Sequence, residues 1–192
     1  MGEMNLANPV TQWSDIKTKI RRLDKPSLLG LVKDLFEFSS ENRNFLTARF
    51  VTAPEDPQRA APYRRRIAEH FYPKRGWGST KTGPVRKIIR EYRKATADAH
   101  GVLDLMLFAV EKGTEFTNDF GDIDEPFYDG MCAIFGEFDK LITHPDHRHL
   151  YPGFAERLKV LAQDTTNIGW GYGDYVSDIV AELEQRLRSA KV

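Results

Sequence analysis

The most apolar stretch of the chain is the run VLDLMLFAV at residues 102–110, in which eight of the nine side chains are non-polar. A run of this length is too short to cross a bilayer, since a membrane-spanning helix needs about 20 apolar residues. It therefore predicts a buried helix. We expect this central helix over residues 97–116, with Asp104 as a carboxylate set among apolar neighbours.

Apolar residues recur at helical spacing along most of the remaining chain. Phe127, Met131, Ile134 and Phe138, for example, step along one face of a predicted helix. No segment shows the convincing alternation of a β-strand. Because short loops favour antiparallel neighbours, we predict an all-α fold of about eight helices, arranged as antiparallel helical hairpins in an irregular bundle or a short solenoid.

Proline and capping residues predict where these helices begin. Asp24 and Asp124 each stand two residues before a proline, which is a strong signal for a helix start. The first five predicted helices lie over 11–23, from 25, from 40, over 62–72 and from 84. The next three lie over 97–116, from 125 and from 152. The last predicted helix has Asp174 as its cap and ends at about 187.

Length and composition predict one ordinary globular domain. The chain has 192 residues, of which 41% are apolar and 29% charged. We expect a loose lead-in over 1–10 and a single all-α domain over 11–192. Cys132 is the only cysteine, which excludes an internal disulfide and fits a reducing cytoplasm. The first residues also lack the pattern of a signal peptide.

Charge is strongly segregated although the formal net charge is zero. Residues 59–97 hold twelve basic and two acidic side chains, whereas residues 98–146 hold twelve acidic side chains against two lysines. This pattern predicts a basic face at about 59–97 and an acidic face at about 98–146.

The candidate binding site is the glycine-rich basic loop at 74–83 with the helix that follows it. A helix start at Pro84 would present free N–H groups to an anion, and Trp77 can stack on a base or insert into a partner. The spacing is not that of a phosphate-binding P-loop, because Pro84 stands where a lysine is required. Alternatively, these cations lie on a solvated face or pair with carboxylates of the same chain. The candidate residues are Lys74, Arg75, Trp77, Lys81, Arg86, Arg90, Arg93 and Lys94.

No pattern predicts a catalytic residue, a metal or a cofactor. The acidic loop around Asp122 lacks the offsets of a calcium loop, and the His144, His147 and His149 cluster lacks a zinc-site framework. Asp104 must either lie at the polar edge of its helix or find a cationic partner, such as Arg43 or Arg49. A hydrolase or transferase that uses Asp104, the acidic loop or the histidine cluster is a third interpretation, which a pocket joining Asp104 to His100 and an arginine would support.

The GWGYG segment at 169–173 predicts a tight turn whose two rings close the end of the core. Taken together, these patterns favour a non-enzymatic helical interaction protein: an adaptor, regulator or subunit that docks a protein partner or a second copy through its charged faces. The alternative is a nucleic-acid-binding protein that uses the loop 74–83 and the next helix. No membrane association is expected.

Several short motifs, together with their order along the chain, resemble those of a family of uncharacterised bacterial all-helical proteins. This family is a domain of unknown function. The likeness extends from about Leu23 to Leu183, and it implies a compact all-α fold without a known activity. The motifs are Leu23 with Pro26, Leu28 and Leu29; Asn44-Phe45-Leu46 with Arg49-Phe50; Phe71-Tyr72-Pro73; Asp104-Leu105-Met106-Leu107; Glu115-Phe116-Thr117; and Gly169-Trp170-Gly171-Tyr172.

Overall fold

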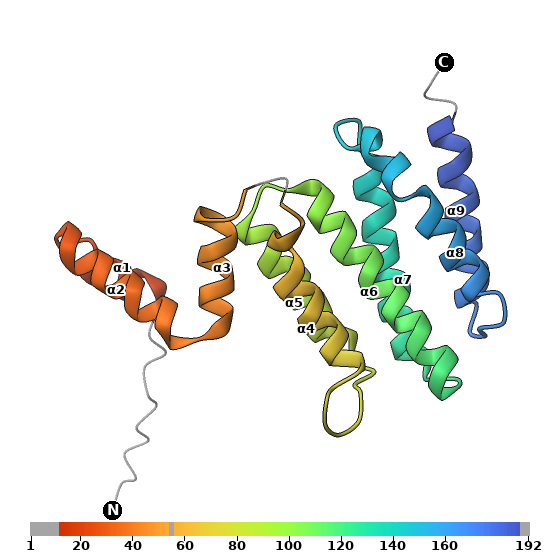
Figure 1. Cartoon of the computed structure of the whole chain (residues 1–192), viewed down its shortest axis with the longest axis horizontal. Coiled ribbons are helices and arrows are strands. Elements are labelled where there is room, and N and C mark those ends of the chain that lie inside the picture. The colour runs from red at the N-terminus through yellow and green to blue at the C-terminus, as the bar shows by residue number, and fades with distance from the viewer. Residues whose placement is uncertain (1–11, 54–55, 189–192) are drawn as a thin grey trace, which may run out of the picture. The chain divides into compact units, whose positions relative to one another are not determined.

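A computed structural model describes residues 12–53 and 56–188, and every regular element in them is a helix (Figure 1). This confirms the predicted all-α class. The expected lead-in over 1–10 lies outside the described residues. The elements are α1 (Trp13–Ile20), α2 (Lys25–Phe38), α3 (Ser40–Phe50), the 3₁₀ helix η1 (Pro57–Arg59), α4 (Ala61–Phe71), α5 (Thr82–Ala95), α6 (Ala99–Phe120), α7 (Glu125–Ile142), the 3₁₀ helix η2 (Arg148–Gly153), α8 (Ala155–Asp164) and α9 (Tyr172–Arg188).

The described residues fall into two compact units, one up to Asn44 and one from Phe45. The single domain expected over 11–192 stays a prediction. In the first unit, the Asp24 carboxylate accepts a hydrogen bond from Ser27 N at 2.9 Å and caps α2, as the sequence predicts. No side chain of α1 or α2 is buried. Their exposed large apolar side chains are Trp13, Ile16, Leu28, Leu29, Val32, Leu35 and Phe38.

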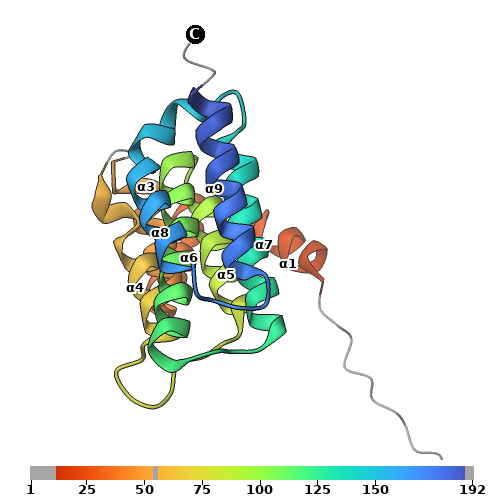
Figure 2. The ribbon, with the colours of Figure 1, turned by 90° about the vertical axis from the view of Figure 1, so that its right-hand side faces the viewer.

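The second unit is a stack of three helical hairpins, α4–α5, α6–α7 and α8–α9. Along the stack, α4 contacts α6 and α6 contacts α8, while α5 contacts α7 and α7 contacts α9. The unit therefore has two layers, α4–α6–α8 and α5–α7–α9, and forms a bundle of helical hairpins (Figure 2).

The predicted central helix is α6, and it is buried as expected: Leu103, Leu105 and Leu107 are fully inaccessible to solvent. It begins two residues later than predicted and ends four residues later, because its buried face continues past residue 116. Thr117 is buried, and its hydroxyl hydrogen-bonds to the Tyr128 hydroxyl at 2.6 Å. The helix ends at Gly121, whose φ of +88° suits a residue without a Cβ.

Three other helix starts differ from the prediction. α5 begins at Thr82, so that Pro84 lies inside its first turn, where a missing N–H costs no hydrogen bond. Pro152 lies within η2, and α8 begins only at Ala155. α9 begins at Tyr172, which places Asp174 in the first turn and not at the cap.

Candidate functional site

The exposed side of α5 carries the main basic surface of the second unit. Its opposite side is buried through Val85, Ile88, Ile89, Tyr92 and Ala95. We call the four exposed cations the α5 basic surface; none of them forms an ion pair with another described residue. They are Lys87, Arg90, Arg93 and Lys94.

Arg86 does not belong to the α5 basic surface, although it is one of the predicted binding residues. Its guanidinium forms an ion pair with Glu137 of α7. Arg86 lies on the side of α5 that faces α7, so the packing of α7 beside α5 brings the Glu137 carboxylate within reach of its guanidinium. The interaction ties α5 to α7 and lowers the capacity of Arg86 to contact a partner.

The loop between α4 and α5 exposes the other predicted binding residues, Lys74, Arg75, Trp77 and Lys81. Trp77 is 91% exposed. The neighbouring Gly78 serves packing, because a Cβ there would lie 1.9 Å from the Phe71 carbonyl oxygen. The close approach of the Gly78 backbone to Phe71 thus explains why this position is a glycine.

The remaining basic residues of 59–97 do not join one face. Arg66 pairs with Glu91 at 2.7 Å, and Arg64 pairs with Asp104 at 2.6 Å. The alternative that cations pair within the chain thus holds for Arg64, Arg66 and Arg86. The α5 basic surface, the loop cations and Arg65 of α4 are the part that stays exposed.

Asp104 links the three helices of one layer. Its carboxylate accepts hydrogen bonds from Arg64 of α4 at 2.7 and 2.6 Å and from Arg157 of α8 at 2.7 Å. Arg157 also makes a bidentate pair with Glu111. Burial alone would lower the pKa of Arg157, but its hydrogen bonds to Glu111 and Asp104 raise it.

The predicted partners of Asp104, Arg43 and Arg49, are wrong. Arg49 donates to the Lys94 carbonyl oxygen at 3.0 Å, and Arg43 lies over the Phe36 ring in the first unit. The true partners, Arg64 and Arg157, are 40 and 53 residues from Asp104. No local pattern connects residues so far apart, which is why sequence reasoning missed them.

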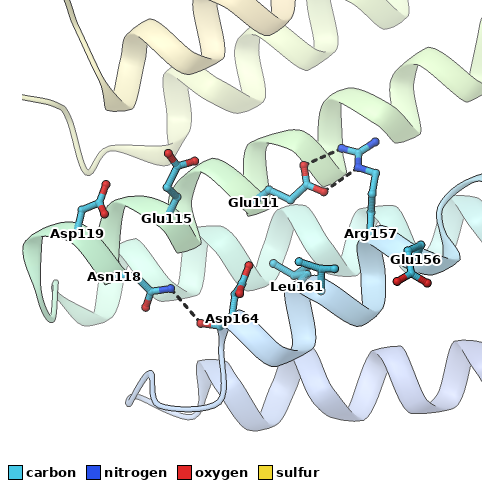
Figure 3. Close-up of a pocket in the computed structure, with 9 residues that line it drawn as sticks. Glu111, Glu115, Asn118, Asp119, Glu156, Arg157, Leu161 and Asp164 are labelled. Atoms are coloured by element: carbon cyan, nitrogen blue, oxygen red, sulfur yellow. Dashed lines mark hydrogen bonds and ion pairs between the residues drawn. The ribbon is translucent and has the colours of Figure 1, made fainter.

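A cavity of about 490 Å³ lies between α6 and α8, and carboxylates dominate its lining (Figure 3). Figure 3 shows Glu111 paired with the only cation of the lining, Arg157, and Asn118 donating to the Asp164 carbonyl oxygen. The lining carboxylates are Glu111, Glu115, Asp119, Glu156 and Asp164. This cavity collects part of the predicted acidic face.

Other carboxylates of residues 98–146 have different roles. Asp98 and Asp124 cap α6 and α7, and Asp139 lies 3.9 Å from Arg186 of α9. The carboxylates of residues 98–146 therefore lie on several sides of the second unit.

A second cavity, of about 960 Å³, lies where η1, the start of α4, the start of α6 and η2 meet. It joins Asp104 to His100 and Arg64, the combination that would favour an enzyme. However, two guanidinium groups already hold both oxygens of Asp104, which supports a structural role for it. No group of described residues is arranged to hold a metal ion, and of the predicted histidine cluster only His147 and His149 line this cavity.

The GWGYG turn closes the core with one of its rings. Tyr172 is buried, and its hydroxyl hydrogen-bonds to that of Thr114 at 2.8 Å. Trp170 stays 57% exposed, and its indole donates to Asp122 at 2.8 Å. The expectation that both rings seal the core is thus wrong for Trp170, which joins the α8–α9 turn to the α6–α7 loop.

No protein-family model, curated protein or solved structure matches the chain. Membership of the bacterial family that the motifs resemble therefore stays a prediction. Within the described residues, no helix is long and apolar enough to cross a membrane.

Proposed function

We propose that this protein is a non-enzymatic helical interaction protein that docks an acidic protein partner through the α5 basic surface and the adjacent loop cations. The observation that carries the proposal is the set of four exposed, unpaired cations on one side of α5. This helix has 14 residues and is about 21 Å long at 1.5 Å per residue. A stripe of like charge on this scale steers an oppositely charged surface into contact and raises the association rate.

The first unit supports an interaction role. Its two helices expose large apolar side chains, among them Phe38 at 85% and Trp13 at 66%. Contiguous exposed apolar side chains are typical of surfaces that bind other macromolecules. We also propose a reducing compartment, such as the cytoplasm, because Cys132 is the only cysteine.

Charge reversal on α5 tests the proposal. We expect the variant Arg90→Glu/Arg93→Glu to lose protein partners that the tagged, nuclease-treated wild-type chain retains in a pull-down. The matched control is Lys140→Glu/Arg148→Glu, which changes the net charge equally at exposed cations of the second unit outside α5. Retention of every partner by the α5 variant, or equal loss by both variants, would refute protein docking at this surface.

Nucleic-acid binding is the second candidate, and Trp77 is the observation that favours it. This ring is 91% exposed between Arg75 and Lys81, an arrangement suited to stacking on an unpaired base. We expect labelled single strands to bind in an anisotropy titration, with affinity falling steeply between about 50 and 200 mM salt. Trp77→Ala should weaken this binding by about tenfold. Absence of binding at about 50 mM salt would eliminate this candidate.

A further inference from the structure

We propose that the cavity at the start of α6, here named the α6 cavity, binds a small organic molecule through a phosphate group. This site is separate from the α5 basic surface and goes beyond the docking function. With a volume of about 960 Å³, the α6 cavity is large enough for a whole metabolite-sized molecule. Its walls are made of η1 and α4 on one side, the first turn of α6, and η2.

The carboxylates of the α6 cavity already have donors. Asp98 accepts from Gly101 N at 2.9 Å and from the Tyr92 hydroxyl at 2.5 Å. Asp104 accepts from two arginines, and Asp56 accepts from Gln58 N at 2.8 Å. With these acceptors satisfied, the cavity offers little to a cationic ligand.

The hydrogen-bond donors of the α6 cavity have fewer partners than its acceptors. Arg59 is only 9% exposed, and its Nε donates to the Ala48 carbonyl oxygen at 2.8 Å. No carboxylate among the described residues forms an ion pair with this buried cation. The guanidinium is therefore not held by a described carboxylate, and it can pair with an anion that enters the cavity.

Three imidazoles add further donors. His100, His147 and His149 line the α6 cavity, and none of their side chains hydrogen-bonds to another described residue. The first turn of α6 also contributes: Gly101 N already donates to Asp98, but the N–H groups of Ala99 and His100 have no partner within the helix and lie at the positive end of the helix dipole. Arg59, these imidazoles and a helix start form a donor-rich environment suited to the several oxygens of a phosphate.

Most of the α6 cavity is left for the rest of the ligand. Inorganic phosphate would fill a small part of its volume, and the other lining groups are small or apolar. They are Ala60, Ala61, Ala97, Ala99, Gly101 and Leu150. We therefore assign the ligand class as a phosphomonoester with a compact apolar body.

Calorimetric titration of the full chain with phenyl phosphate tests the assignment. We expect saturable binding at one site per chain, and binding at least about tenfold weaker for benzoate, which keeps the ring and carries one charge. Arg59→Gln should weaken the binding of phenyl phosphate by about tenfold or more.

Two further variants test the proposal if Arg59→Gln does not fold. Such a loss of folding has a physical reason, because Arg59 Nε also donates a hydrogen bond to the Ala48 carbonyl oxygen. Ala97→Trp fills the α6 cavity from an exposed position and should abolish binding while leaving every cation in place. His149→Gln should weaken it. Circular dichroism checks that each variant is folded.

The α5 variant Arg90→Glu/Arg93→Glu is the matched control and should bind phenyl phosphate as the wild type does. If this variant loses both phenyl phosphate binding and its protein partners, phosphate binding belongs to the α5 basic surface. That result would overturn the proposal of a ligand site in the α6 cavity. No binding of phenyl phosphate by the wild type, or unchanged binding by Ala97→Trp, would also overturn it, whatever the outcome for docking.

Discussion

Asp104 holds three helices of the second unit together through charge-assisted hydrogen bonds. Its carboxylate lies between Arg64 and Arg157, and its side chain is only 17% exposed. The Arg64 guanidinium also lies 4.0 Å from the centre of the Phe108 ring, a cation–π contact that keeps it in place. Loss of the carboxylate would leave two partly buried cations facing each other.

We expect Asp104→Asn to lower the free energy of unfolding by about 2 kcal/mol, because both guanidinium groups lose a charged acceptor. Urea denaturation monitored by circular dichroism measures the change. Glu115→Gln is the control, since its pair with Lys112 is more exposed and should be worth less than about 0.5 kcal/mol. Equal effects of the two substitutions would show that Asp104 has no special structural role.

Among the elements, α5 and α7 approach each other closely at a glycine. An added Cβ on Gly130 of α7 would lie 2.0 Å from Thr82 Oγ1, at the first residue of α5. This approach places the start of α5, and with it the basic loop, next to α7. Gly83, one residue along α5, has open space around its own Cβ position.

We expect Gly130→Ala to destabilise the protein by about 1–3 kcal/mol, because the methyl group must displace a short side chain near the backbone. Gly83→Ala should leave stability unchanged or raise it by up to about 1 kcal/mol, since alanine has the higher helix propensity. Thermal unfolding distinguishes the two. A stabilising Gly130→Ala would mean that α5 and α7 do not pack at this distance.

At the scale of the whole molecule, the buried apolar residues among those described all lie in the second unit, from Ala48 to Leu187. The first unit contributes no buried side chain from α1 or α2. Because burial of apolar surface is the main source of folding free energy, the second unit holds what it needs to fold alone.

We expect a fragment of residues 39–192, which keeps α3 with its cap Ser39, to fold cooperatively. Its melting temperature should lie within about 3 °C of the value for the full chain, a shift that corresponds to about 1 kcal/mol for a chain of this size. Differential scanning calorimetry provides both values. A fragment without a cooperative transition would show that residues 1–38 contribute to the core.

The sequence by itself determined the all-α class, the buried central helix and the cap of α2 by Asp24. These features depend on contacts between residues one to four apart, which apolar spacing and capping residues report directly. It also located the exposed cations of α5, because they share one helix with the apolar residues opposite them.

Only the tertiary structure decided which charges are free and where the cavities lie. Arg86 reaches Glu137, 51 residues away, and Asp104 reaches Arg157, 53 residues away. The α6 cavity likewise combines η1, the start of α6 and η2. The physical reason is that such contacts follow from how separate helices pack, and the periodicity within each helix carries no information about its neighbour's register.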